Sequence, residues 1–194
     1  MVHTLDQTVR KSGFKAGLIL GLVTTFLNIL SFYIITSPSV SAPVFIVAPI
    51  LLRAFIPMFV VLYLCFAVRK NVGGLWTFKQ ATTGIFIMLM VAYLFNLVGK
   101  DLVFDKVIEP NGIEKTQTAA INAKAGNMKE KGVSQDKIDA SIAEMKKDFS
   151  QKDNFSIGSF ITENAFIVLF LFVFAVIFAS LIRNAEYVPA PGKK

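Results

Sequence analysis

Four apolar blocks of membrane-spanning length constrain the fold of this chain more than any other feature of its sequence. They cover about residues 14–35, 42–68, 76–99 and 158–182, the last followed by a short tail to residue 194. Each reaches or approaches the ~20 residues that an α-helix needs to cross a hydrocarbon core about 30 Å thick. Only 17% of the side chains are charged, against about 25% in soluble domains. The sequence therefore predicts an all-α, polytopic membrane protein with four transmembrane helices.

The first block resembles a secretory signal peptide in part, because basic residues precede it and small residues follow it at 39–41. The apolar region of a signal peptide is about 7–15 residues long. Residues 14–35 form a longer block. We therefore expect a first transmembrane span that is not cleaved.

Basic residues at the ends of the blocks predict the orientation, since short cytoplasmic segments are enriched in lysine and arginine. The segment before the first block, the loop after the second block and the C-terminal tail are basic, while the loop at 36–41 carries no charge. The basic residues are Arg10, Lys11, Lys15, Arg69, Lys70, Arg183, Lys193 and Lys194. We expect both termini on the cytoplasmic side and residues 100–157 on the opposite side.

Residues 100–157 differ from the four blocks, because they are polar and carry equal numbers of acidic and basic side chains. In "VSQDKIDASIAEMKKDF", residues 133–149, apolar side chains recur at helical spacing on one face. Ser134 is placed to cap this helix, and Gly132 is placed to end a preceding helix over about 114–131. We expect a helical hairpin outside the membrane, between the third and fourth transmembrane helices.

The composition argues against several kinds of function. The net charge of +7 does not indicate nucleic-acid binding, since outside residues 100–157 the basic side chains flank apolar blocks. The single cysteine, Cys65, and the single histidine, His3, leave no cluster of metal ligands. The sequence contains no catalytic triad, no paired catalytic carboxylates and no HExxH motif. We expect no catalytic residue, no metal and no cofactor, and hence a protein that is not an enzyme.

One arginine lies inside the second block, in "APILLRAFIPMF" at residues 48–59. A charged side chain in the bilayer core costs at least ~2.5–3.5 kcal/mol, so we expect Arg53 to be paired or to line a wet cavity. Glu163, near the same end of the fourth block, is the carboxylate that Arg53 could reach. Three further side chains at similar depth complete a predicted polar cluster: Asn28, Asn96 and Asn164. Two interpretations stay open, a salt bridge that fixes helix register and a site for a ligand, ion or lipid headgroup.

Two prolines flank this arginine. Pro49 and Pro57 lack the backbone N–H that a helix interior uses, and they leave the carbonyls of Phe45 and Arg53 without their usual donors. Unpaired carbonyls at membrane depth face either protein or a water-filled cavity. We therefore expect helix kinks at both prolines, satisfied by neighbouring helices or beside a polar cavity.

The first block contains a row of small residues. Gly13, Gly17 and Gly21 recur at every fourth position, and Thr25 continues the row. Such a ridge lets another helix approach closely. We expect a helix-packing surface here, with its partner either in the same chain or in another one.

The segment "NVGGLWTFKQA", residues 71–81, joins the second and third blocks. Its two adjacent glycines favour a turn. Trp76 and Lys79 are of the types that anchor a helix at the membrane interface, where the ring lies among headgroups and the lysine extends toward water. We expect both side chains at the membrane surface.

Three features together resemble a known family. They are "KAGLILGL" in the first span, "GGLWTFKQA" before the third, and a long exterior helical segment before an aliphatic last span. The chain resembles an uncharacterised family of small four-span membrane proteins from Bacteroidota, classed as a domain of unknown function. The resemblance implies a bacterial inner membrane and places residues 100–157 in the periplasm. It implies no activity and no catalytic residues.

Two function hypotheses follow. The first is an accessory or interaction subunit of a membrane assembly, in contact with the lipid bilayer and with a membrane-protein partner or a second copy of the chain. The alternative is a small transporter, channel component or lipid-binding protein with a polar intramembrane site around Arg53. A water-accessible cavity that reaches Arg53 and holds a ligand would favour the alternative, whereas a dry Arg53–Glu163 pair and an exposed glycine face would favour the accessory role.

Overall fold

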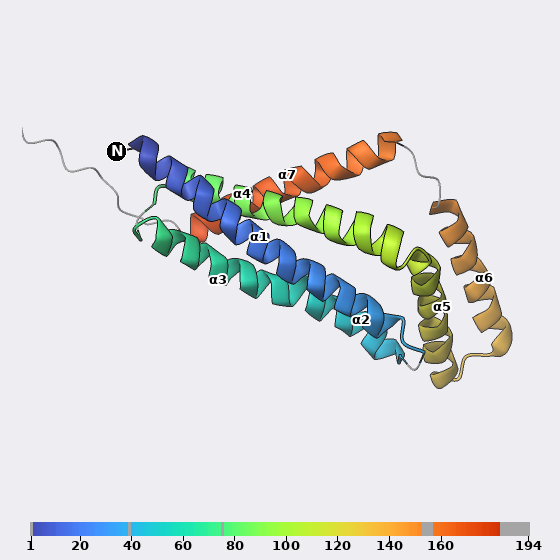
Figure 1. Cartoon of the computed structure of the whole chain (residues 1–194). Helices are drawn as coiled ribbons and strands as arrows, with labels where there is room; N and C mark the ends of the chain where they lie inside the picture. Colours follow the sequence, from blue (N-terminus) through green and yellow to red (C-terminus); the bar gives the residue numbers. More distant parts are fainter. Residues whose placement is uncertain (1, 39, 75, 153–156, 183–194) are drawn as a thin grey trace, which may run out of the picture. The chain divides into compact units, whose positions relative to one another are not determined.

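The described part of the chain is helical throughout, with short connecting loops (Figure 1). This computed structural model describes residues 2–38, 40–74, 76–152 and 157–182, apart from the side chains of residues 2–4, 151–152, 157–161 and 163. The helices are α1 (Val2–Ile35), α2 (Ala42–Ile50), η1 (Leu51–Phe55), α3 (Ile56–Asn71), α4 (Phe78–Asn96), η2 (Leu97–Ile108), α5 (Gly112–Glu130), α6 (Gln135–Lys152) and α7 (Ile157–Ile182).

Four stretches of helix among the described residues are long and apolar enough to cross a membrane. They are Leu5–Ile35, Ala42–Asn71, Phe78–Ile108 and Asn164–Ile182. Their number and order confirm the predicted fold class, an all-α chain with four candidate membrane spans. Many of their large apolar side chains are not covered by other parts of the chain, as lipid contact requires.

Two of these stretches contain π-helical segments, in which each N–H bonds to the carbonyl five residues earlier. The segment η1 interrupts the second stretch between α2 and α3. The longer η2 continues α4 without a break as far as Ile108. The helix of the third span therefore extends beyond residue 99, where the sequence suggested its end.

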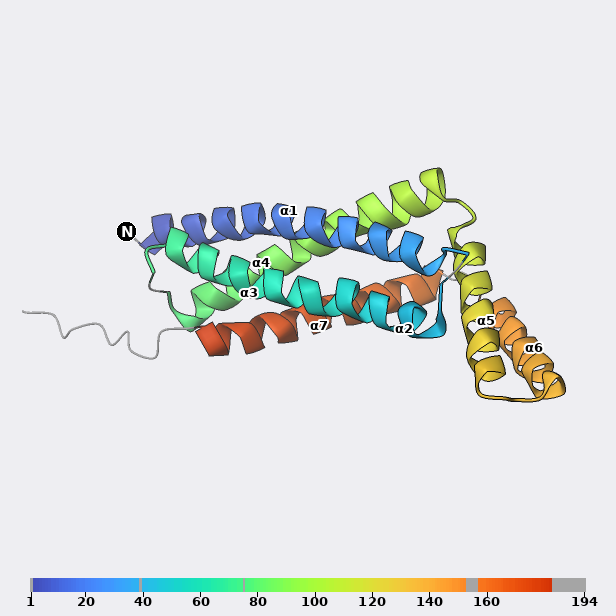
Figure 2. The same ribbon diagram turned by 90° about the horizontal axis from the view of Figure 1, so that it is seen from below.

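The segment between the third and fourth spans contains the predicted helical hairpin. Helices α5 and α6 lie side by side (Figure 2). The turn between them contains Gly132 with a φ of 71°, a left-handed conformation that suits glycine and ends a helix. Ala119, Ala123 and Ile138 are the buried side chains of the pair.

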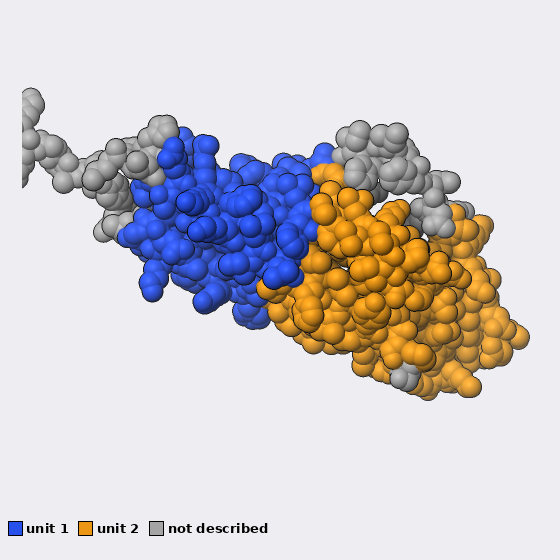
Figure 3. Space-filling model, viewed as in Figure 1, with its two compact units in different colours: residues 1–22, 59–95, 165–194 blue, residues 23–58, 96–164 orange. Residues whose placement is uncertain are grey.

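The chain divides into two compact units, which Figure 3 shows in different colours. Unit 1 takes its described residues from 1–22, 59–95 and 165–194, and unit 2 takes them from 23–58 and 96–164. Unit 1 has an apolar core drawn from α1, α3, α4 and α7. Its most deeply buried members, each with 0% exposure, are Cys65, Ala81, Met88, Ala175 and Ala179.

The glycine row of α1 packs against α4 inside unit 1. A Cβ atom built on Gly13 would lie 2.5 Å from the carbonyl oxygen of Gly84. One built on Gly17 would lie 2.7 Å from the carbonyl oxygen of Met88. Contacts this short exclude any larger side chain unless the helices separate. The helix that the glycine row accommodates is therefore one of the same chain.

The turn between α3 and α4 is held by contacts within the protein. Arg69 Nε donates a hydrogen bond of 2.9 Å to the carbonyl oxygen of Gly74, which has a positive φ of 80°. Trp76 is only 3% exposed and belongs to the core of unit 1. Its ring lies beside Gly84, where the missing side chain leaves room for it. Lys79 is exposed, as an interface lysine would be, whereas the indole is enclosed by protein.

Candidate functional site

The local structure around Arg53 is a single turn of π-helix between two prolines. The segment η1 holds Arg53 at its centre, and the N–H of Ile56 bonds to the carbonyl of Leu51 five residues earlier. Pro57 has no N–H to donate, so the α-helical bond to the carbonyl of Arg53 cannot form. A π-turn contains one extra residue, so that backbone N–H groups bond to carbonyls five residues earlier instead of four. Such turns are frequent at functional sites.

A buried serine holds the guanidinium of Arg53. Its Nε atom donates a hydrogen bond of 3.1 Å to Oγ of Ser31, a side chain with 0% exposure. Ser31 lies on α1, four residues before the helix ends at Ile35, which is about 6 Å along the helix axis. Within the described part of the chain, no ion pair to Arg53 is formed. The terminal nitrogens of the guanidinium therefore remain as donors.

Arg53 lines a cavity of about 410 Å³ that belongs entirely to unit 2. Residues from α1, η1, η2, α5 and α6 line it: Phe32, Arg53, Lys100, Asp105, Gly112, Ile113, Thr116, Gln117, Ala120 and Phe149. Its walls are mostly apolar, and a few charged or polar groups converge on them. That combination is the usual composition of a site for a small molecule.

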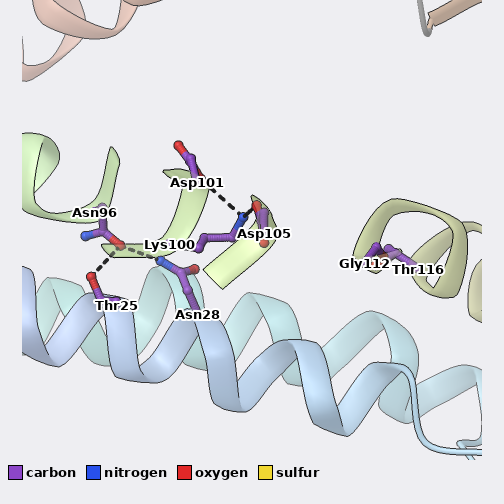
Figure 4. Close-up of polar contacts among 8 residues, drawn as sticks. All are labelled: Thr25, Asn28, Asn96, Lys100, Asp101, Asp105, Gly112 and Thr116. Atoms are coloured by element: carbon purple, nitrogen blue, oxygen red, sulfur yellow. Dashed lines mark hydrogen bonds and ion pairs between the residues drawn. The ribbon is translucent and has the colours of Figure 1, made fainter. Parts of the chain in front are cut away.

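The second cation of the cavity is already neutralised. Lys100 Nζ lies 2.6 Å from a carboxylate oxygen of Asp105 and 3.2 Å from one of Asp101 (Figure 4). In an α-helix, residues five apart point about 140° away from each other. The π-helical geometry of η2 brings positions five apart onto one side, so Lys100 can meet Asp105. Arg53 is therefore the cation of the cavity lining that has no carboxylate within ion-pair distance among the described residues.

Aromatic side chains pack the end of α1 against η2. The rings of Phe32 and Phe104 are both buried and lie edge to face, with their centroids 5.3 Å apart. Tyr33 completes the group, with its ring 5.8 Å from that of Phe104 and its hydroxyl 3.4 Å from a carboxylate oxygen of Glu109. Since Phe32 also lines the cavity, this packing fixes one of its walls.

A hydrogen-bonded cluster lies along the same face of α1. Thr25 Oγ1 and Asn28 Nδ2 donate to Asn96 Oδ1 at 3.2 and 3.0 Å (Figure 4). Asn96 Nδ2 in turn donates to Thr24 Oγ1. Both ends of the Asn96 amide are thus paired, and the cluster joins α1 to the end of α4 within unit 2. A network in which every polar group is hydrogen-bonded holds neighbouring helices together inside a membrane span.

The structure brings together two members of the predicted polar cluster. Asn28 and Asn96 meet directly, while Arg53 bonds to Ser31 further along the helix. The side chain of Glu163 lies outside the described residues, so its pairing with Arg53 stays a prediction. Asn164, on α7, is partly buried.

The sequence-based prediction missed several site residues, and some of them had a signal. Thr24 and Ser31 lie four residues before and three residues after the predicted Asn28, which places all three on one helix face of an otherwise apolar block. Lys100 and Asp105 had none, because only the π-helical geometry of η2 brings them together. Within the described residues, no group of three histidine, cysteine or acidic side chains is arranged to hold a metal ion.

Comparison with known proteins identifies the family and nothing further. A family profile described as "Protein of unknown function (DUF4199)" matches residues 11–184. No curated protein and no solved structure matches the chain. The function must therefore be inferred from the geometry of the site.

Proposed function

The chain belongs to the DUF4199 family of membrane proteins of unknown function, and on that premise we propose that it is a non-enzymatic inner-membrane protein that binds an anionic amphiphile in the Arg53 cavity. This deepens the lipid-binding alternative that the sequence left open. Lipid molecules surround the spans, so the proposed ligand is present wherever the protein is.

One observation carries the proposal. Arg53 has no ion pair among the described residues, yet it lines a cavity whose walls are mostly apolar. A guanidinium in such surroundings gains most from an anion, which it can hold through two parallel N–H bonds. Because the cavity lies near the end of α1, the anion would sit close to the level of lipid headgroups.

Two features favour this function over an accessory subunit. The glycine row, whose exposure would have favoured the accessory role, is occupied by α4 of the same chain. The exposed apolar side chains of the span helices are also what lipid contact alone requires. A homo-oligomer or a stoichiometric partner would have to use another surface.

The distribution of basic residues supports a topology for the site. We infer that both termini are cytoplasmic and that α5 and α6 are periplasmic. Arg10 and Lys11 precede the first span, Arg69 and Lys70 follow the second, and short cytoplasmic segments are enriched in lysine and arginine. The cavity then opens toward the periplasmic leaflet.

Native mass spectrometry of the purified full chain tests the proposed function. We expect the wild-type protein, released from detergent that contains phosphatidylglycerol, to retain the lipid at one molecule per chain. Arg53→Gln should lose it, while Arg10→Gln removes the same charge from an exposed position in unit 1 and should retain it. Equal retention by all three proteins would refute the Arg53 site, and a stoichiometric protein partner in its place would favour the accessory role.

A further inference from the structure

A second cavity of about 380 Å³ lies next to the Arg53 cavity in unit 2, between α2, α5 and α6. Its walls are almost entirely apolar and include Phe45, Ile46, Ala120, Ala123, Met128 and Met145. Ala120 lines both cavities. The two cavities therefore adjoin at Ala120.

Resting on the proposed function, we infer that the ligand is a phospholipid with a singly charged phosphodiester headgroup, and that one of its acyl chains lies in the α2–α5–α6 groove. The charge of the first cavity, the sizes of both and their shared lining residue, Ala120, each support this ligand over the other anions of a membrane.

The charge of the Arg53 cavity selects one negative charge. Lys100 is neutralised by Asp105 at 2.6 Å, so Arg53 supplies the net positive charge of the lining residues. A phosphodiester carries a single negative charge shared by two oxygens, which matches the paired donors of a guanidinium. A phosphate monoester with a second charge would find no second unpaired cation among the described residues that line this cavity. Gln117 also lines the cavity and can donate to the same headgroup.

The sizes of the two cavities separate a phospholipid from a fatty acid. Both volumes fall within the ~300–1,000 Å³ that is typical of ligand sites. A carboxylate would fill little of the 410 Å³ around Arg53, whereas a glycerophosphate headgroup uses that space. A free phosphate ion, in contrast, would leave the apolar groove without an occupant.

The lining of the groove suits a flexible hydrocarbon chain. Ala120 and Ala123 lie one turn apart on α5, and their small side chains form the floor of the groove. Met128 and Met145 have unbranched, polarizable side chains that adapt to an irregular partner. Lys124 and Asn127 add polar groups to the same lining, where they can face the headgroup layer.

The test compares amphiphiles and variants by native mass spectrometry of the full chain, with dissociation constants from lipid titration. The probes are dioleoyl phosphatidylglycerol, dihexanoyl phosphatidylglycerol, oleate and inorganic phosphate. Ala120→Phe places a ring where the two cavities join. Ala143→Phe adds the same ring at an exposed position of α6 that lines neither cavity and serves as the matched control.

We expect dioleoyl phosphatidylglycerol to bind most tightly. Ala120→Phe should weaken it at least about tenfold, to the level of the dihexanoyl lipid, while Ala143→Phe should leave it unchanged. Arg53→Gln should weaken both lipids at least about tenfold.

The outcomes separate the two levels of inference. If Arg53→Gln weakens binding but Ala120→Phe and chain length have no effect, the acyl groove is refuted and the proposed function stands. If oleate binds as tightly as the phospholipid, or if phosphate alone competes with it fully, the phosphodiester assignment is wrong. If Arg53→Gln changes nothing, the proposed function itself fails.

Discussion

Arg53 of η1 donates a hydrogen bond of 3.1 Å from its Nε atom to the hydroxyl oxygen of Ser31 on α1, and the serine is completely buried. The bond joins two candidate membrane spans that are separate in sequence. Because it uses only one of the five guanidinium N–H groups, it orients the arginine and leaves the remaining donors for a ligand. The same contact therefore has a structural role and prepares a binding site.

Loss of this contact should affect both stability and binding. In Ser31→Ala, Arg53 keeps its charge but loses its positioning bond, so we expect the free energy of unfolding to fall by about 0.5–1.5 kcal/mol and lipid affinity to fall several-fold. Thermal unfolding in detergent and the lipid titration measure the two effects. Ser180→Ala is the control, since Ser180 is exposed and donates only to the carbonyl of Val176 in its own helix. Identical behaviour of the two variants would show that the Ser31 contact has no consequence.

The packing of α1 against α4 leads to a second prediction. Gly17→Ala would place a Cβ atom 2.7 Å from both the Met88 carbonyl oxygen and the Cβ of Val91, so the helices must move apart. We expect a loss of about 1–3 kcal/mol in the free energy of unfolding, as overpacking usually costs. Gly126→Ala is the contrasting variant, because nothing lies within 4 Å of a Cβ atom at that position of α5.

The two glycine variants should shift the melting temperature in opposite directions. Alanine at an open helix position is favoured over glycine by roughly 0.5–1 kcal/mol, so Gly126→Ala should raise it slightly. A Gly17→Ala protein as stable as the wild type would mean that α1 and α4 do not pack through this glycine.

The Asn96 cluster predicts a measurable coupling between helices. Asn28→Leu and Asn96→Leu each break the bond of 3.0 Å between their amides, and each leaves other polar partners behind. A double-mutant cycle on the free energy of unfolding should give a coupling of about 0.5–1.5 kcal/mol, within the range found for bonds between membrane helices. If the effects of the two substitutions are additive, the bond between Asn28 and Asn96 does not stabilise the packing of α1 against α4.

The inferred topology can be tested with single cysteines. The only native cysteine, Cys65, has 0% exposure and should resist a maleimide until the protein is denatured. In a Cys65→Ala background, Gly126→Cys on α5 should react with a membrane-impermeant maleimide added to intact cells. Lys70→Cys, at the exposed C-terminal end of α3, should react only after the cells are permeabilised. The reverse pattern would invert the topology and place the cavity at the cytoplasmic leaflet.

The sequence by itself determined the elements that depend on local composition. Apolar length decided the four spans, because each helix must be long enough to cross the hydrocarbon core. Gly132 decided the turn of the hairpin, because its left-handed conformation suits a residue without a side chain. Pro57 indicated a fault in the second span, and the fault is a π-turn at Arg53.

Only the tertiary structure decided which of these elements meet. The glycine row could have faced any helix, and it faces α4, where Gly13 meets the backbone of Gly84 and Gly17 meets Met88 and Val91. Trp76 has the composition of an interface anchor, yet the space beside Gly84 encloses its ring. Arg53 bonds to Ser31, and Lys100 to Asp105, through helix register and π-helical geometry. These contacts depend on distances of a few ångströms between segments far apart in sequence or on an uncommon helical pitch, and neither is encoded in local composition.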